Sequence, residues 1–174
     1  MALITPDNEA LGWALARRAL EEIGLSVGSD VPFCVRGGTA LAEGRGEVLT
    51  DLPPLPACAI VVCKPEFGLS TPALFGRVRV EKLGRRPDHD AMKQALAAGN
   101  LGAVARQMGN VFEEVLTAEE SREIAYLKDV MLRCGALNAV MTGSGPTVFG
   151  LFAQKEQAER AAQTLRSRYA QLFL

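Results

Sequence analysis

The amino-acid sequence predicts an α+β fold in which helices pack on a mostly antiparallel sheet. Short extended segments separated by glycines indicate β-hairpins, and a wholly apolar run at residues 57–63 indicates a buried strand. Amphipathic segments of helical period lie between and after these strands. Since 48% of the 174 residues are hydrophobic and 22% are charged, the chain can bury a core of ordinary size. This order of strands and helices is typical of helices layered on one sheet.

The first predicted element is a helix from about residue 7 to residue 23. Asp7 or Asn8 can cap its start, and Gly24 is expected to end it. Its expected apolar face consists of Leu11, Leu15, Ala19, Leu20 and Ile23. The spacing of these side chains predicts a helix that buries one side.

Extended segments are expected after this helix. They lie at residues 31–35, 39–42 and 47–49, and glycine-rich turns separate them as in hairpins. The run 57–63 contains only apolar residues and is rich in β-branched ones. It therefore predicts a central strand that is covered on both faces.

The rest of the chain is predicted to be mainly helical before a final hairpin. Thr71 begins a short helix with Pro72 at its first position, and Thr117 has the spacing of a capping box with Glu120. Further helices are expected at residues 88–98, at 101–116 with a weak point at 109–110, at 117–134 and at 155–168. Strands are expected at residues 138–141 and 147–152, with an edge strand at 169–173.

Charge and composition exclude several classes of function. The 19 basic and 20 acidic residues give a net charge of -1, which offers no basic field for nucleic acid or anionic lipid. The longest apolar run, residues 52–63, contains prolines and is shorter than the roughly 18 residues that suggest a membrane span. We therefore expect neither a nucleic-acid partner nor a membrane partner, and a cytoplasmic location.

The cysteines and the histidine do not indicate a metal site. Cys34, Cys58, Cys63 and Cys134 are scattered, and His89 is the only histidine. A structural metal site needs clustered ligands, so no protein-bound metal is expected and the thiols should be reduced and mostly buried. His89 lies in a polar stretch that is typical of a solvated helix start.

Two segments are candidates for chemistry. The sequence GSDVPF at residues 28–33 places the carboxylate of Asp30 in a turn of small residues. The sequence TGSGPT at residues 142–147 joins two apolar strands with a loop that lets a ligand approach the backbone. Taken separately, each segment also fits a purely structural turn, in which Asp30 would bond nearby backbone N–H groups.

Taken together and in this order, these segments resemble the GHMP family of small-molecule kinases. The sequences RGGTA at 36–40, GRGEVL at 44–49 and the stretch from KP at 64–65 to STPALF at 70–75 strengthen the resemblance, which spans about residues 24–152. These segments are most similar to the branch of the family that phosphorylates a cytidyl substrate in the non-mevalonate isoprenoid pathway. The resemblance implies that residues 51–174 form the ferredoxin-like C-terminal domain and that residues 1–50 are a remnant of the N-terminal domain.

The resemblance also implies roles for individual residues. Asp30 would accept the proton of the substrate hydroxyl as it attacks the γ-phosphate of ATP, with Mg²⁺ as cofactor. Residues Gly143, Ser144 and Gly145 would line the cleft beside the phosphates. Phe75 would contact the cytosine ring, although a core position suits a phenylalanine equally well, and Arg45 would lie in the turn beside that site.

One feature of the family is missing from this sequence. It contains no Gly- and Ser-rich phosphate loop and no lysine before Lys64. We therefore expect the C-terminal portion of a kinase that is inactive alone. Its bared apolar surface would promote self-association or be covered by the first helix. Two alternatives stay open: another GHMP kinase, such as a mevalonate, homoserine or galactose kinase, and a non-catalytic α+β binding module.

Overall fold

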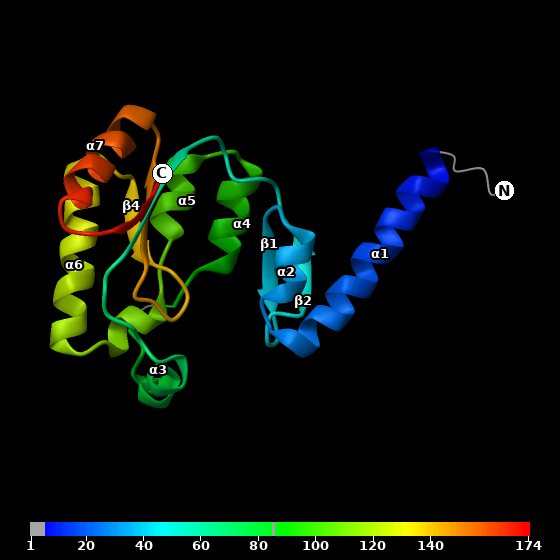
Figure 1. The fold of residues 1–174 in the computed structure, drawn as a ribbon, viewed down its shortest axis with the longest axis horizontal. Coiled ribbons are helices and arrows are strands. Elements are labelled where there is room, and N and C mark those ends of the chain that lie inside the picture. The colour runs from blue at the N-terminus through cyan, green and yellow to red at the C-terminus, as the bar shows by residue number, and fades with distance from the viewer. Residues whose placement is uncertain (1–5, 85) are drawn as a thin grey trace. The chain divides into compact units, whose positions relative to one another are not determined.

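The structure is a computed structural model that describes residues 6–84 and 86–174 (Figure 1). The chain divides after Pro54 into two compact units. Both units combine helices with antiparallel strands, so the α+β expectation is confirmed. That the first unit is a remnant of a kinase N-terminal domain stays a prediction.

The first unit contains two helices and one hairpin. Its elements are α1 (Pro6–Val27), α2 (Val31–Arg36), β1 (Ala40–Glu43) and β2 (Val48–Asp51), and the two strands pair antiparallel. Gly24 does not end α1, as expected from the sequence, but lies inside it. A Cβ atom at Gly24 would come within 2.6 Å of Val31 Cγ1. The glycine therefore allows α1 and α2 to approach each other closely.

Residues 31–35 form a helix and not the extended segment that the sequence suggested. Pro32 lies in the first turn of α2, where its fixed φ suits the helix and its missing N–H costs nothing. Asp30 is the N-cap residue, and Gly37 follows the last turn. A helix of six residues is too short for its period to be read from sequence, so the β-branched valines were misleading.

Arg36 ties the elements of this unit together. Its guanidinium donates to both carboxylate oxygens of Glu21 at 2.9 and 3.2 Å, and to the carbonyl oxygen of Leu49 at 2.9 Å. Asp51 lies 3.6 Å from the same group. The hydrogen bonds that Arg36 donates to Glu21 raise the pKa of Arg36 above its usual value. One side chain thus links α1, α2 and β2.

The described apolar side chains of α1 are largely exposed within this unit. Trp13 is 70% exposed, and Leu15, Leu20, Ile23 and Val27 are at least half exposed. The side chain of Leu11, which the sequence placed on the same face, lies outside the described residues. The expected burial of this face is therefore wrong for the described part, and self-association through it stays a prediction.

The second unit is built on a four-stranded antiparallel sheet. Its strands are β3 (Ala59–Lys64), β4 (Asn138–Met141), β5 (Val148–Phe152) and β6 (Gln171–Phe173), in the order β4-β5-β3-β6. Val61 pairs with Gly150 of β5, and Cys63 pairs with Leu172 of β6. The strand β3 is central and β6 is an edge strand, as the sequence predicted.

Helices surround this sheet and follow the expected order. They are α3 (Thr71–Arg77), α4 (His89–Ala97), α5 (Leu101–Gln107), α6 (Ala118–Arg133) and α7 (Lys155–Arg166), with 3₁₀ turns η1 (Val80–Lys82) and η2 (Val111–Val115). The capping box of Thr117 and Glu120 is formed. The helix expected at 101–116 breaks after Gln107 and resumes as η2, whose N-cap residue is Asn110.

The main core lies where α6 and α7 cover one face of the sheet (Figure 1). Val61, Met131, Phe152 and Leu165 are at most 1% exposed there. A second, smaller cluster packs α5 residues against Val140 and Leu151 on the other face. Ile60 of β3 is 36% exposed. The expectation that β3 is covered on both faces is therefore wrong, because burial alternates along this strand.

Candidate functional site

Asp30 lies in the turn between α1 and α2. The turn is closed by hydrogen bonds from Val31 N to Gly28 O and from Cys34 N to Asp30 O, both at 3.1 Å. The side chain of Asp30 makes no capping hydrogen bond, and the residue is exposed. The alternative in which this carboxylate serves only its own turn is therefore not supported. Its oxygens are available to a ligand.

The β1–β2 hairpin turn packs directly on the Asp30 turn. A Cβ atom at Gly46, which has φ +113°, would lie 2.8 Å from Ser29 O. Glycine is therefore required both by the backbone conformation and by the close approach. Arg45 is exposed in this hairpin turn, next to the contact. The structure thus brings the turns that hold Asp30 and Arg45 together.

Glu47 stabilises the hairpin turn, and its carboxylate accepts a hydrogen bond from the turn backbone. One of its carboxylate oxygens accepts from Arg45 N at 2.6 Å. Hydrogen bonds from its own N–H and from that of Arg45 hold the pKa of Glu47 below its usual value. The glutamate of the GRGE sequence is therefore explained by turn formation.

The glycine loop, residues 142–147, connects β4 to β5 in the second unit. Thr142 N donates to Thr147 O at 2.8 Å, and Gly145 N donates to Thr142 O at 2.9 Å. Gly143 and Gly145 have φ of +55° and +73°, a region that favours glycine. Among the described residues, the N–H groups of Gly143 and Ser144 have no hydrogen-bond partner. They are therefore free to donate to an anionic group.

The helix α3 begins against this loop. The hydroxyl oxygens of Thr71 and Ser144 are 2.7 Å apart. At its other end, Arg77 forms two hydrogen bonds with Glu120, of 2.7 and 3.3 Å, and these lower the pKa of Glu120. Contacts at both ends therefore fix α3 beside the loop.

Phe75 projects from α3 and is 62% exposed, so a core position for this residue is ruled out. Its ring packs edge-to-face on Phe112, with centroids 5.0 Å apart and planes at 80°. Such a pair holds an aromatic ring in a defined orientation while leaving a face open. Phe75 can therefore offer a stacking surface close to the loop that Thr71 contacts.

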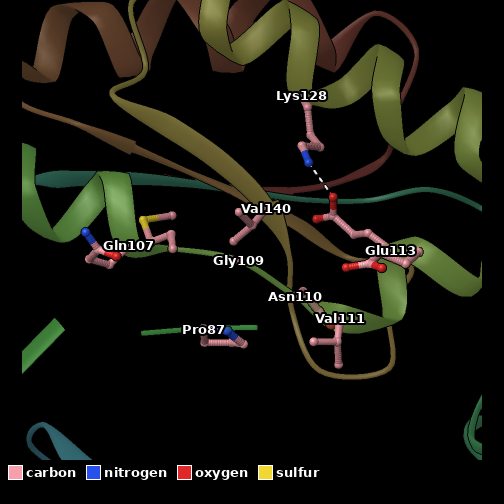
Figure 2. A pocket seen from close by; sticks show the side chains of 10 residues that line it. Pro87, Gln107, Gly109, Asn110, Val111, Glu113, Lys128 and Val140 are labelled. Carbon is pink, nitrogen blue, oxygen red and sulfur yellow. Dashed lines mark hydrogen bonds and ion pairs between the residues drawn. The ribbon is translucent and has the colours of Figure 1, made fainter. Parts of the chain in front are cut away.

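Two cavities border residues 107–110. One of about 180 Å³ is lined by residues that include Asn110, Glu113 and Lys128 (Figure 2). The other, of about 310 Å³, is lined in part by Asn110, Thr142 and Gly143. Sequence reasoning missed Asn110, Glu113 and Lys128. Only Asn110 carried a signal, as a capping residue at the predicted weak point of a helix.

The structure assembles the expected site residues in two groups. Asp30 and Arg45 belong to the first unit, whereas Phe75, Gly143, Ser144 and Gly145 belong to the second. That both groups line one groove stays a prediction. Over the described ranges there is no group of three or more His, Cys, Asp or Glu side chains that could hold a metal ion. No helix among these residues is long and apolar enough to cross a membrane.

The burial of the thiols differs from the sequence expectation, although all four cysteines are free. Cys63 is buried, but Cys34 is exposed and the other two cysteines are intermediate, so the thiols are not mostly buried. Burial raises the pKa of Cys63 to about 11, from 9.0. His89 is exposed as the first residue of α4, which is the solvated helix start that we expected.

Residues 92–171 match the family model described as GHMP kinases C terminal. The chain is 44% identical over 154 residues to the 4-diphosphocytidyl-2-C-methyl-D-erythritol kinase of Geobacillus kaustophilus, a match that covers 88% of the chain and 52% of that kinase. The chain belongs to the GHMP kinase family. It is also 42% identical to the kinase of the same name from Caldicellulosiruptor saccharolyticus, over 99% of the chain and 59% of the relative.

Solved structures agree with this family. A crystal structure of 4-(cytidine 5'-diphospho)-2C-methyl-D-erythritol kinase matches with a TM-score of 0.70 and 31% identity, over 88% of this GHMP kinase chain and 55% of the other. L. major mevalonate kinase matches with a TM-score of 0.59 and 17% identity, which shows the shared fold alone. The chain thus spans between half and three fifths of the length of these kinases.

Proposed function

We propose that this chain is part of a kinase that transfers the γ-phosphate of ATP to a hydroxyl of 4-diphosphocytidyl-2-C-methyl-D-erythritol. The observation that carries the proposal is the 44% identity to a kinase of that name over 88% of the chain. Structures of homoserine and mevalonate kinases share only 19% and 17% identity, against 31% for the cytidyl enzyme. The cytidyl substrate is therefore preferred to homoserine and mevalonate.

Asp30 is proposed to accept the proton of the attacking hydroxyl. Phosphoryl transfer passes through a loose transition state, so its catalysis is mostly positioning and charge stabilisation. An exposed carboxylate with no capping bond to its own main chain can orient a hydroxyl and receive its proton. It also offers an oxygen of the kind that Mg²⁺ prefers. Mg²⁺ on the ATP phosphates would supply charge neutralisation.

The second unit is proposed to bind phosphate oxygens and the cytosine base of the substrate. The free N–H groups of Gly143 and Ser144 suit phosphate oxygens, since backbone donors in a glycine loop form an anion-binding concavity. The exposed ring of Phe75 suits stacking on the cytosine base. Arg45 would add positive charge near Asp30. A cytoplasmic location is consistent with ATP as phosphate donor.

The test is a hybrid kinase. The part of the Geobacillus kaustophilus kinase that the match leaves uncovered is joined to residues 1–174 of this chain, and the folded hybrid is assayed with Mg-ATP. We expect phosphorylation of 4-diphosphocytidyl-2-C-methyl-D-erythritol and no turnover of mevalonate or homoserine. The 174-residue chain alone should be inactive. A folded hybrid that prefers mevalonate or homoserine would reassign the substrate, and one that phosphorylates none of the three would favour a binding module.

The role of Asp30 is tested in the same hybrid. Asp30→Asn and Asp30→Ala should lower kcat by about a hundredfold to ten-thousandfold, because the proton acceptor is lost. Asp51→Asn is the matched control, since Asp51 is an exposed acid of the same unit. It should leave kcat within about twofold. Near-normal turnover of Asp30→Asn would place Asp30 among structural turn residues.

A further inference from the structure

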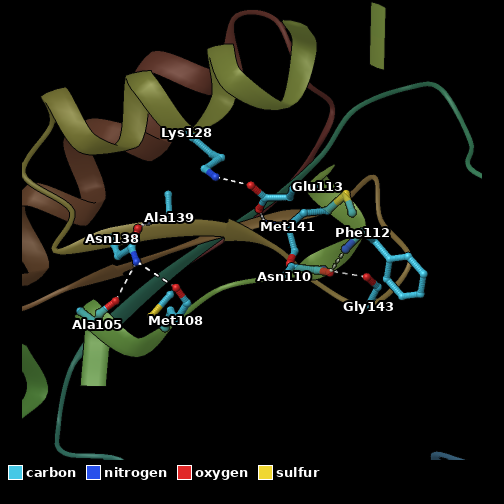
Figure 3. A network of polar contacts seen from close by, with 10 residues as sticks. All are labelled: Ala105, Met108, Asn110, Phe112, Glu113, Lys128, Asn138, Ala139, Met141 and Gly143. Atoms are coloured by element: carbon cyan, nitrogen blue, oxygen red, sulfur yellow. Dashed lines mark hydrogen bonds and ion pairs between the residues drawn. The ribbon is translucent and has the colours of Figure 1, made fainter. Parts of the chain in front are cut away.

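Asn110 connects three segments of the second unit (Figure 3). Its Nδ2 donates to Met141 O, at the end of β4, and to Gly143 O, in the glycine loop, both at 2.8 Å. Its Oδ1 accepts from Phe112 N at 2.9 Å. One amide therefore joins a strand end, the loop and the turn that carries Phe112, on which Phe75 packs.

The two halves of the glycine loop are held in different ways. A Cβ atom at Gly145 would lie 2.3 Å from Met141 Sδ and 3.1 Å from a methyl of Leu69, so packing confines this half. A Cβ atom at Gly143 would meet nothing within 4 Å, and the residue is exposed. No packing around the Cβ position confines Gly143. The hydrogen bond from Asn110 Nδ2 to its carbonyl oxygen holds it instead.

The surroundings of Asn110 make this hydrogen bond more important. The cavities of about 180 and 310 Å³ both border Asn110 and residues 107–109, and the first of them is drawn in Figure 2, so this side of the segment is incompletely packed. The end of β4 is anchored separately, because Glu113 Oε1 accepts from Met141 N at 2.7 Å and the same carboxylate pairs with Lys128 of α6. Asn110 links this anchored strand end to the loop through its hydrogen bonds to Met141 O and Gly143 O.

We propose that Asn110 is a positioning residue of the kinase. It fixes the donor groups of Gly143 and Ser144 at a set separation from the Phe75–Phe112 ring pair. The consequence for turnover rests on the proposed function, in which phosphate oxygens meet the loop and the cytosine meets Phe75. Asn110 acts through the loop backbone and is not a catalytic residue.

The chain offers a matched control at the other end of the same strand. Asn138 Nδ2 donates to Ala105 O at 2.7 Å and to Met108 O at 3.5 Å, and its Oδ1 accepts from Ala139 N at 2.8 Å (Figure 3). It makes the same kind of contacts as Asn110, but to α5 and not to the loop. A general loss of stability should follow equally from either substitution.

The first test uses the 174-residue chain and ¹⁵N relaxation. Asn110→Asp keeps the size and the acceptor but removes the donor and places a carboxylate against two carbonyl oxygens. The amide order parameters of Gly143 and Ser144 should fall from about 0.85 to below about 0.6, while that of Gly145 stays near its original value. In Asn138→Asp all three should be unchanged. Asn110→Ala, which adds no charge, replaces Asn110→Asp if that variant does not fold.

The second test measures kinetics in the hybrid kinase at equal folded fraction. Asn110→Asp should lower kcat about a hundredfold, as expected for a misplaced phosphate contact, whereas Asn138→Asp should stay within about twofold of the parent. Unchanged order parameters at Gly143 and Ser144, or equal losses in both variants, would overturn the proposal. So would a kcat that Asn110→Asp leaves intact. If the loop loosens as expected while no hybrid phosphorylates the cytidyl substrate, the loop positioning stands and the proposed function fails.

Discussion

Thr71 and Ser144 are 73 positions apart in the sequence, yet their hydroxyl oxygens lie 2.7 Å apart. The contact joins the first residue of α3 to the tip of the glycine loop. Because α3 also carries Phe75, the hydroxyl pair connects the proposed cytosine contact of Phe75 to the proposed phosphate contact of the glycine loop.

Thr71→Val and Ser144→Ala should each reduce stability only slightly. A hydrogen bond between exposed side chains contributes about 0.5–1 kcal/mol, and the double variant should lose no more than either single one. Urea unfolding of the 174-residue chain measures the three free energies of unfolding. Strict additivity of the two losses would show that the hydroxyls do not interact in solution.

Phe75→Ala in the hybrid kinase should raise KM for the cytidyl substrate about tenfold with little change in kcat, because a stacked aromatic contact is lost. Thermal unfolding should change little, since Phe75 is 62% exposed. Phe173→Ala is the matched control, an aromatic of the same unit that is 66% exposed. An equal KM change in both variants would remove Phe75 from the binding site.

Gly46→Ala should destabilise the first unit by about 2–3 kcal/mol, because the new methyl meets Ser29 O and the backbone has positive φ. Gly28→Ala is the control, since its methyl would make only an ordinary contact at 3.5 Å. It should cost about 1 kcal/mol or less. The comparison is made by denaturant unfolding followed through Trp13 fluorescence. Equal effects would mean that the two turns do not pack together.

Stability of the hairpin turn should depend on the ionisation of Glu47. The pKa of Glu47 is lower in the folded chain than its ordinary value of 4.5, so its contribution is present above that value. The contribution should fade as the pH falls through the lower folded pKa. Glu47→Gln should flatten the pH dependence of the unfolding free energy below about pH 5. Parallel pH curves for the parent and the variant would contradict this role.

The cysteines should react with a thiol reagent in a fixed order. Cys34 is exposed and should be modified first, whereas Cys63 is buried with a pKa of about 11 and stays a protonated thiol at pH 8. Cys63 should therefore react only after denaturant is added. Mass spectrometry of labelled peptides identifies each site. Early labelling of Cys63 would show that the main core opens readily.

Much of the second unit could be predicted from the sequence because its signals are local. The capping box of Thr117, the cap of Asp88 and the apolar run around Val61 each act within a few residues. Two predictions were wrong where long-range packing determines the local structure. Gly24 allows a close helix contact and does not end α1, and Ile60 is uncovered on a face that its apolar sequence suggested was buried.

The candidate site shows the same division. The sequence by itself determined the family, through the turn that holds Asp30 and the glycine loop around Ser144, since both motifs are contiguous and chemically distinctive. Only the tertiary structure decided that Phe75 is exposed, that Thr71 meets Ser144 and that Asn110 holds the loop. The last two are contacts between segments about 30 to 70 residues apart. Chain folding, not local residue preference, determines which side chains meet in them.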